Sequence, residues 1–174
     1  MRFTKPFAAI LALALMLNMA CNNTDTPKAP TAEEIEAESA RLNTWFDTVW
    51  DEQVSRYPVW KAYLGIKDST AGEWGDFSDS MQLVEIEILK QNLAFLKDSF
   101  DFNKLNEVTQ TSYRMWVADA EDEIKNFDFR MHGYPIDQMN GIHTWLPSFL
   151  MNIHQVGNVQ DAKDYIARLQ KIDV

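Results

Sequence analysis

The stretch TAEEIEAESARLNTWFDTVWDEQVSRY, residues 31–57, decides the fold class of this 174-residue chain. It opens with a capping box, in which the Thr31 hydroxyl accepts from a first-turn amide while Glu34 reaches back to the cap residue. Large apolar residues then recur at spacings of three, four and seven, which is the period of one helix face. They are Ile35, Leu42, Trp45, Phe46, Val49, Trp50, Val54 and Tyr57. The pattern predicts a long amphipathic helix that ends at Pro58.

A second helix is predicted after a loop. Residues 59–64 form one more helical turn that Gly65 stops, and residues 65–78 form a surface loop, because they hold three glycines and show no apolar period. Ser78 or Asp79 caps the helix that follows. Its apolar stripe consists of Met81, Val84, Ile88, Leu89, Leu96 and Phe100.

A third helix is predicted to begin at Asn106, with Leu105 as the apolar residue just before the cap. Its inner face consists of Val108, Tyr113, Trp116, Val117, Ala120, Ile124 and Phe127. The acidic run Asp119, Glu121, Asp122 and Glu123 falls mostly on the opposite face. A run of this kind is typical of a solvated helix surface rather than of a metal site.

Residues 127–157 are too apolar for an ordinary loop and too rich in Gly and Pro for one long helix. We expect short turns and a short helix, packed against the bundle or lining a cleft; residues 127–131 are the only short strand candidate. Asn158 then caps a last helix. Its predicted buried face consists of Ala162, Tyr165, Ile166, Leu169 and Ile172. The fold class is therefore all-α, with a helical domain over 31–174, and the absence of a helix stop signal before Val174 predicts a truncated domain.

Composition excludes several classes of protein. The formal net charge is -10, with 46% hydrophobic and 12% aromatic residues. So many rings require a core, which argues against a disordered chain. An acidic chain is a poor ligand for phosphates, so we expect no nucleic-acid partner. A single Cys excludes an internal disulfide.

Residues 1–21 are predicted to be a lipoprotein signal peptide. Arg2 and Lys5 precede an apolar run over 7–17, which is too short to span a bilayer. Ala20-Cys21 resembles the bacterial lipobox, which makes Cys21 the predicted lipid (palmitate) attachment site. The alternative is ordinary cleavage after Ala20, which leaves a free Cys. Residues 22–30 form a polar, flexible tether, and Asn22 favours the outer membrane, facing the periplasm, by resemblance to Gram-negative sorting.

No catalytic motif is visible in the sequence. His132, His143 and His154 lack the spacing of a zinc site, and we expect them to pack among aromatic side chains with backbone hydrogen bonds. No nucleophile elbow, phosphate loop or His-Glu-x-x-His motif occurs. Trp45, Trp50 and Trp116 fall at helical spacing and are predicted to be core residues. Trp74, in a Gly-flanked loop, is the tryptophan predicted to be an exposed contact.

Three blocks of sequence resemble the N-terminal part of a bacterial family, the domain of unknown function 885. The blocks are LNTWF (42–46) continuing to YP (57–58) and YLGI (63–66), then 105–113, then YPIDQMNGIH (134–143) with LPSFL (146–150) and YIARL (165–169). Members of that family are mostly helical and much longer than this chain, and many of them are exported and lipidated. They are similar to zinc metallopeptidases with two lobes around a cleft.

The family's signature, His-Glu-x-x-Pro-Gly-His-His, is absent from this sequence. No catalytic or metal-binding residue is therefore carried over, and zinc is implied only for the full-length family, where it would polarise a carbonyl and activate water. The resemblance implies that this segment forms one wall of a substrate cleft. The residues where cleft-lining side chains are expected are Tyr134, Gln138, Asn140 and His143.

The leading functional hypothesis is the N-terminal, cleft-forming part of an exported, membrane-anchored, metallopeptidase-like hydrolase that acts on peptides. Its partners would be the membrane, through the N-terminal lipid, and a peptide substrate. The alternative is a small helical envelope lipoprotein that binds a ligand or partner without catalysis. A third hypothesis is a purely structural envelope lipoprotein. The sequence fixes neither the substrate nor the oligomeric state.

Overall fold

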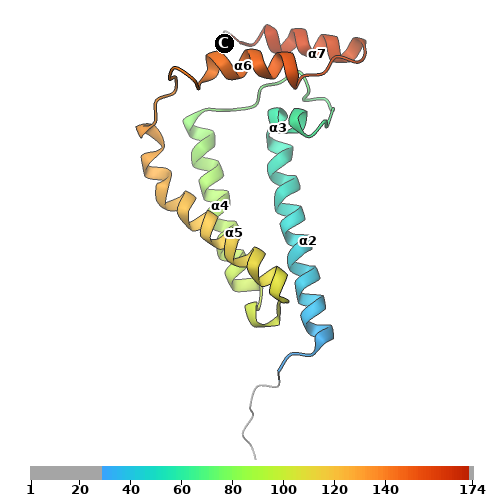
Figure 1. Ribbon diagram of the computed structural model, residues 1–174, viewed down its shortest axis with the longest axis vertical. Coiled ribbons are helices and arrows are strands. Elements are labelled where there is room, and N and C mark those ends of the chain that lie inside the picture. Colours follow the sequence, from blue (N-terminus) through green and yellow to red (C-terminus); the bar gives the residue numbers. More distant parts are fainter. Residues whose placement is uncertain (1–28, 173–174) are drawn as a thin grey trace, which may run out of the picture. The chain divides into compact units, whose positions relative to one another are not determined.

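The computed structural model describes residues 29–172, and every named element of that range is helical (Figure 1). The all-α prediction is confirmed. Within the described range the one β-type contact is an isolated antiparallel bridge between Ile136 and Gly141. The predicted signal peptide and all but the end of the predicted tether lie outside the described residues. The described part contains no helix of the length and apolarity that a bilayer crossing requires.

Helix α2 (Ala32–Arg56) and helix α3 (Pro58–Tyr63) are separated by a single residue. Proline lacks an amide hydrogen and disfavours a helical conformation at the residue before it. Tyr57 is accordingly extended, with φ -117° and ψ 95°, and Pro58 starts α3, a position where its missing donor costs nothing. Gly65, with φ +73°, follows the end of α3 in the left-handed conformation that favours glycine. Both predicted stops are confirmed.

Helices α4 (Asp79–Ser99) and α5 (Glu107–Asn126) both begin at the predicted cap residues. The Ser78 hydroxyl accepts from a first-turn amide at 3.2 Å. The Asn106 side chain accepts from the Thr109 amide at 2.8 Å. Helix α4 packs against α5, and α5 also contacts α2.

The first hydrophobic cluster lies where these three helices meet. Leu42, Leu96, Phe100 and Leu105 are buried there. The rings of Trp45 and Trp116 pack beside them, with their centroids 5.4 Å apart in an edge-on arrangement. Burying a leucine side chain contributes about 2 kcal/mol, so this cluster is the main apolar contribution to the α2–α4–α5 bundle.

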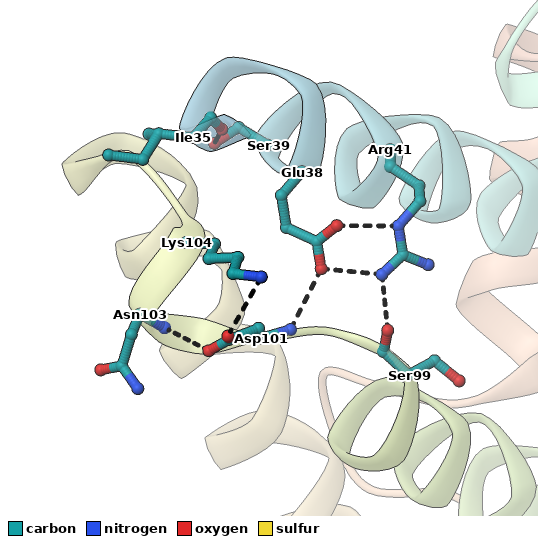
Figure 2. A network of polar contacts seen from close by, with 8 residues as sticks. All are labelled: Ile35, Glu38, Ser39, Arg41, Ser99, Asp101, Asn103 and Lys104. Carbon is teal, nitrogen blue, oxygen red and sulfur yellow. Dashed lines mark hydrogen bonds and ion pairs between the residues drawn. The ribbon is translucent and has the colours of Figure 1, made fainter. Parts of the chain in front are cut away.

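A polar network fastens the start of α2 to the connection between α4 and α5 (Figure 2). Arg41 pairs with Glu38 at 2.7 Å and also donates to the carbonyl of Ser99. Glu38 accepts from the backbone amide of Asp101 at 3.0 Å. The Arg41 guanidinium, with help from that amide, lowers the pKa of the Glu38 carboxyl. The network gives the backbone groups between α4 and α5 partners on α2.

A second hydrophobic cluster holds α3, α6 (Ile142–Asn152) and α7 (Val159–Leu169) together. Its buried residues are Val59, Phe149 and Leu150. The Phe149 ring contacts Trp74 at a centroid distance of 5.3 Å. Trp74, which was predicted to be an exposed contact, is therefore part of this packing. Trp50, which was predicted to lie in the core, is instead largely exposed.

Several predicted details of the helices are wrong. Residues 127–131 are not a strand, because they continue from α5 into the 3-10 helix η2 (Phe127–His132). Val108, predicted on the inner face of α5, is 77% exposed in the first helical turn. Val84 is exposed as well, and the buried residue in that half of α4 is Ile86, which shares a cavity wall with Tyr57 and Phe127. The N-terminal half of α4 therefore packs through a face that the apolar period did not predict.

The last helix is rotated relative to its predicted orientation. Ile166, Leu169 and Ile172 are exposed, whereas Asp161 and Arg168 are buried. The reason is a polar contact set on the inner side of α7, which satisfies Arg168 from three directions. A buried cation with all its partners in place outweighs the exposure of three aliphatic side chains, because removing those partners would leave the charge unsatisfied.

Candidate functional site

A cavity of about 210 Å³ lies between α3, the loop after it, and α7. Its wall combines three cations with three carboxylates, unlike the apolar clusters of the fold. The cations are Lys61, Lys67 and Arg168, and the carboxylates are Asp68, Asp161 and Asp164. His154, from the connection between α6 and α7, completes the polar wall.

Arg168 is the buried centre of this wall, with 1% of its surface exposed. Its Nε donates to the carbonyl of Glu73 at 3.0 Å, and its Nη2 donates to the carbonyl of Pro58 at 3.3 Å. The guanidinium also lies over the Phe149 ring, 4.9 Å from its centroid. The indole of Trp74 returns a hydrogen bond to the backbone carbonyl of Arg168 at 2.9 Å. One side chain thus connects α7 to α3 and to the loop between α3 and α4.

The tautomer of His154 follows from its contact with Arg168. An arginine side chain has donors and no acceptor, so the Nδ1 of His154, 2.8 Å from Nη1 of Arg168, must accept. The proton of the neutral ring is then on Nε2, which donates to the carbonyl of Asp161 at 3.2 Å. Burial lowers the pKa of His154, and the Arg168 charge lowers it further. The ring contacts Tyr165 edge-on, so the predicted surroundings of His154 are confirmed.

Asp161 closes the site from the N-terminal end of α7. Its carboxylate pairs with the Lys67 ammonium at 2.6 Å and accepts from the amide of Gly157 at 2.9 Å. The Lys67 ammonium, followed by that amide, lowers the pKa of the Asp161 carboxyl. The Asn158 side chain accepts from the amides of Gln160 and Asp161, which confirms the predicted cap. The carboxylate of Asp161 and the side chain of Asn158 therefore both hydrogen-bond to the backbone around the start of α7.

The chemistry available to this cavity is recognition and positioning. Its charged groups are already engaged with one another, with the Gln160 side chain or with backbone groups, and the imidazole of His154 uses both nitrogens. Sequence reasoning missed Arg168 and Asp161 as inward-facing residues. The one available sequence signal is their seven-residue spacing, which places both on the same side of α7.

The four predicted cleft-lining residues lie in the turn before α6 and in the first turn of that helix. Tyr134 is 90% exposed, and Gln138, Asn140 and His143 are exposed too. None of the contacts within residues 29–172 joins two of these four side chains, and none of the four lines the cavity around Arg168. Their assignment to a cleft stays a prediction.

The turn that carries these residues is tightly built. The Asp137 carboxylate accepts from the backbone amides of Met139 at 2.7 Å and Asn140 at 2.6 Å. These two bonds lower the pKa of the Asp137 carboxyl. Gly141 has φ +135°, and a Cβ there would lie 2.9 Å from the carbonyl oxygen of Pro135. Only glycine fits that position, so the turn presents its exposed side chains from a fixed backbone.

Metal binding has no support within the described residues. Between residues 29 and 172, no group of three or more His, Cys, Asp or Glu side chains is placed to hold a metal ion. A zinc site needs three or four convergent ligands.

Comparison with known proteins gives one match. Residues 58–174 match the family described as "Bacterial protein of unknown function (DUF885)". No curated protein and no solved structure shows significant similarity to the chain. The matched range begins at the first residue of α3 and contains the cavity around Arg168 and the turn before α6.

Proposed function

Because the chain belongs to the DUF885 family of bacterial proteins of unknown function, we propose that it is the N-terminal, cleft-forming part of an exported, membrane-anchored, metallopeptidase-like hydrolase. The substrates are peptides, as the resemblance of that family to helical zinc metallopeptidases implies. This segment contributes a wall of the cleft and no metal ligands. Metal chemistry belongs to a part of the protein that carries the family's His-Glu signature.

The observation that carries the proposal is the exposed apolar surface inside the matched range. Residues 129–142 present a series of large apolar side chains to solvent. They are Phe129, Met131, Tyr134, Ile136, Met139 and Ile142. An exposed apolar surface of this kind marks a place that contacts a partner or ligand. The fixed turn at Asp137 and Gly141 supports a binding role, because a pre-ordered backbone loses little entropy when it binds.

Membrane attachment through Cys21 is the second part of the proposal. Its support is the sequence alone, since the residue lies outside the described range. Expression with radiolabelled palmitate is expected to label the wild-type chain and not the Cys21→Ser variant. Label retained by the variant would reject Cys21 as the attachment site, and an unlabelled wild type cut after Ala20 would favour ordinary signal cleavage.

Peptide hydrolysis is tested on the product of the whole reading frame. We expect it to cleave a mixed peptide library, with loss of activity under a zinc chelator and recovery on addition of zinc. The 174-residue chain is expected to be inactive in the same assay. Cleavage by the 174-residue chain alone would contradict the division of roles. Absence of cleavage by the whole product, together with ligand binding, would favour the alternative of a non-catalytic envelope lipoprotein.

A further inference from the structure

Three adjoining cavities run along the side of the α2–α4–α5 bundle, apart from the site at Arg168. Their volumes are about 430, 280 and 360 Å³. The first and second share Trp116 and Asp119 in their walls, and the second and third share Glu85 and Glu123. Because neighbouring cavities share wall residues, we treat the three together and call them the acidic furrow.

One end of the acidic furrow presents large apolar side chains beside its carboxylates. Trp50 is 46% exposed and Met115 is 62% exposed, and both line the cavity of about 430 Å³. The Trp50 ring stands edge-on to Trp60, with centroids 6.1 Å apart. Trp116, in the wall of the same cavity, packs against Trp45 and the first hydrophobic cluster. Aromatic side chains with few rotatable bonds offer contact area at a low entropic cost.

The acidic furrow carries uncompensated negative charge. Within the described residues, Asp47, Asp119 and Glu123 have no ion pair or hydrogen bond. The two cations of the wall are already paired, Arg56 with Glu85 at 2.7 Å and Arg130 with Asp79 at 2.9 Å. The three unpaired carboxylates therefore leave a local charge of three negative units.

The pKa of Tyr57 is raised in part by carboxylates of the furrow. Burial, reinforced by the neighbouring Glu85 and by Glu123, raises the pKa of Tyr57 to about 12. Tyr57 lines the furrow and stays protonated, so it adds no charge, and its hydroxyl is already hydrogen-bonded to Glu85.

We propose that the acidic furrow binds a cationic peptide segment that also carries an apolar side chain. Asp119 and Glu123 lie four residues apart on α5, which separates neighbouring side chains by about 6 Å. Alternate side chains of an extended peptide are spaced by about 7 Å, so two lysines flanking one residue match the two carboxylates. The apolar side chain of the peptide packs on Trp50 and Met115. This inference deepens the proposed function and rests on it only for the role of the peptide as a substrate.

The test measures binding directly, without requiring hydrolysis. The full chain, in a nonionic detergent, is titrated with fluorescently labelled Phe-Ser-Lys-Ser-Lys, whose apolar and basic side chains share one face when extended, and with the matched peptide Phe-Ser-Glu-Ser-Glu, and polarisation is followed. The lysine peptide is expected to bind and the glutamate peptide is not. The affinity for the lysine peptide is expected to fall as salt is raised, because exposed charges are screened.

Matched variants locate the site. The double variant Asp119→Asn/Glu123→Gln is expected to bind the lysine peptide at least tenfold more weakly, since two charge-assisted contacts are lost. The control variant Glu36→Gln/Asp98→Asn changes the net charge equally but lies outside the furrow, and is expected to bind within twofold of wild type. Met115→Ala is expected to weaken binding severalfold. Circular dichroism melting curves of all variants verify that each is folded.

Three outcomes would overturn the proposal. The first is equal binding of the two peptides, and the second is an equal loss in the furrow and control variants. The third is a change of sedimentation velocity, rather than of peptide binding, in the furrow variant, which would make a second copy of the chain the occupant. Binding without cleavage by the whole product upholds the furrow and contradicts the substrate role. Cleavage of lysine peptides that the furrow variant leaves unchanged upholds the proposed function and contradicts the furrow.

Discussion

The two hydrophobic clusters of this chain are built in different ways. The buried residues of the first, around Leu42 and Leu96, are all apolar, and its polar contacts, including the partly exposed Arg41 guanidinium over the Phe100 ring, lie at the helix ends. The second, around Phe149, encloses a guanidinium and an imidazole together with its apolar side chains. In the first cluster the area removed from water sets the orientation of the helices. In the second, hydrogen-bond satisfaction sets it, and the apolar side chains of α7 remain outside.

The largest effect is expected at Arg168. Replacing it with alanine leaves the acceptors on Pro58, Glu73 and His154 without their donor and removes a side chain that contacts Phe149. We expect Arg168→Ala to lower the free energy of unfolding by about 3–5 kcal/mol, as measured by urea unfolding followed by far-UV circular dichroism. Lys90→Ala, at an exposed cation of α4, is the control and should change it by less than about 0.5 kcal/mol. Equal effects of the two variants would mean that the buried network contributes nothing.

Leu96→Ala tests the first cluster in the same assay. Leu96 is fully buried, so truncation creates a cavity, and a loss of about 2–4 kcal/mol is expected. The matched control is Leu83→Ala on the same helix, where the side chain is largely exposed and a loss below about 1 kcal/mol is expected. A larger loss at Leu83 than at Leu96 would show that α4 packs through the opposite face.

The contrast between the clusters explains which features could be predicted from the sequence. The helix starts at Ser78, Asn106 and Asn158 were predictable because a cap is a local interaction between one side chain and the next turn. The stop at Pro58 was predictable because it follows from the proline ring. The all-α class follows from the sum of such local patterns.

The orientation of α7 and the cavity around Arg168 could not be predicted in the same way. Apolar periodicity identifies the most apolar face of a helix, and it carries no information on which carbonyls a distant arginine will find. The acceptors on Pro58 and Glu73 are 110 and 95 residues away from Arg168 in the sequence. Trp74 was misjudged for the same reason, since its partner on α7 is a backbone carbonyl.

Acid is expected to weaken the second cluster before the first. The pKa of folded His154 lies below the unfolded value of about 6.5, so the unfolded chain takes up this proton first. The contribution of His154 is therefore complete above about pH 6.5 and is lost as the pH falls through the folded pKa. Asp161 and Asp164 oppose the lowering of the pKa, and Arg168 adds to it. Protonation would also place an N–H of His154 against an N–H of Arg168.

The measurement is the urea midpoint between pH 7.5 and pH 5, a range that lies above the titration of carboxyls such as Glu38. We expect the midpoint of the wild type to fall, by less than either truncation changes it. His154→Gln should flatten this dependence, because a glutamine amide oxygen accepts from Arg168 at every pH. Parallel curves for wild type and variant would assign the pH dependence to other groups.

The smallest effect is expected at Ile166, where the two interpretations of α7 differ most. If apolar periodicity had set the orientation of the helix, Ile166→Gln would bury a polar group without a partner and cost several kcal/mol. In the structure Ile166 is 53% exposed, so the substitution should change the free energy of unfolding by at most about 0.5 kcal/mol in urea unfolding. Leu150→Gln, at a buried residue of the second cluster, is the positive control. A large loss of unfolding free energy in Ile166→Gln would indicate that the apolar side of α7 faces the interior. It would contradict the orientation of α7 in which Arg168 is buried.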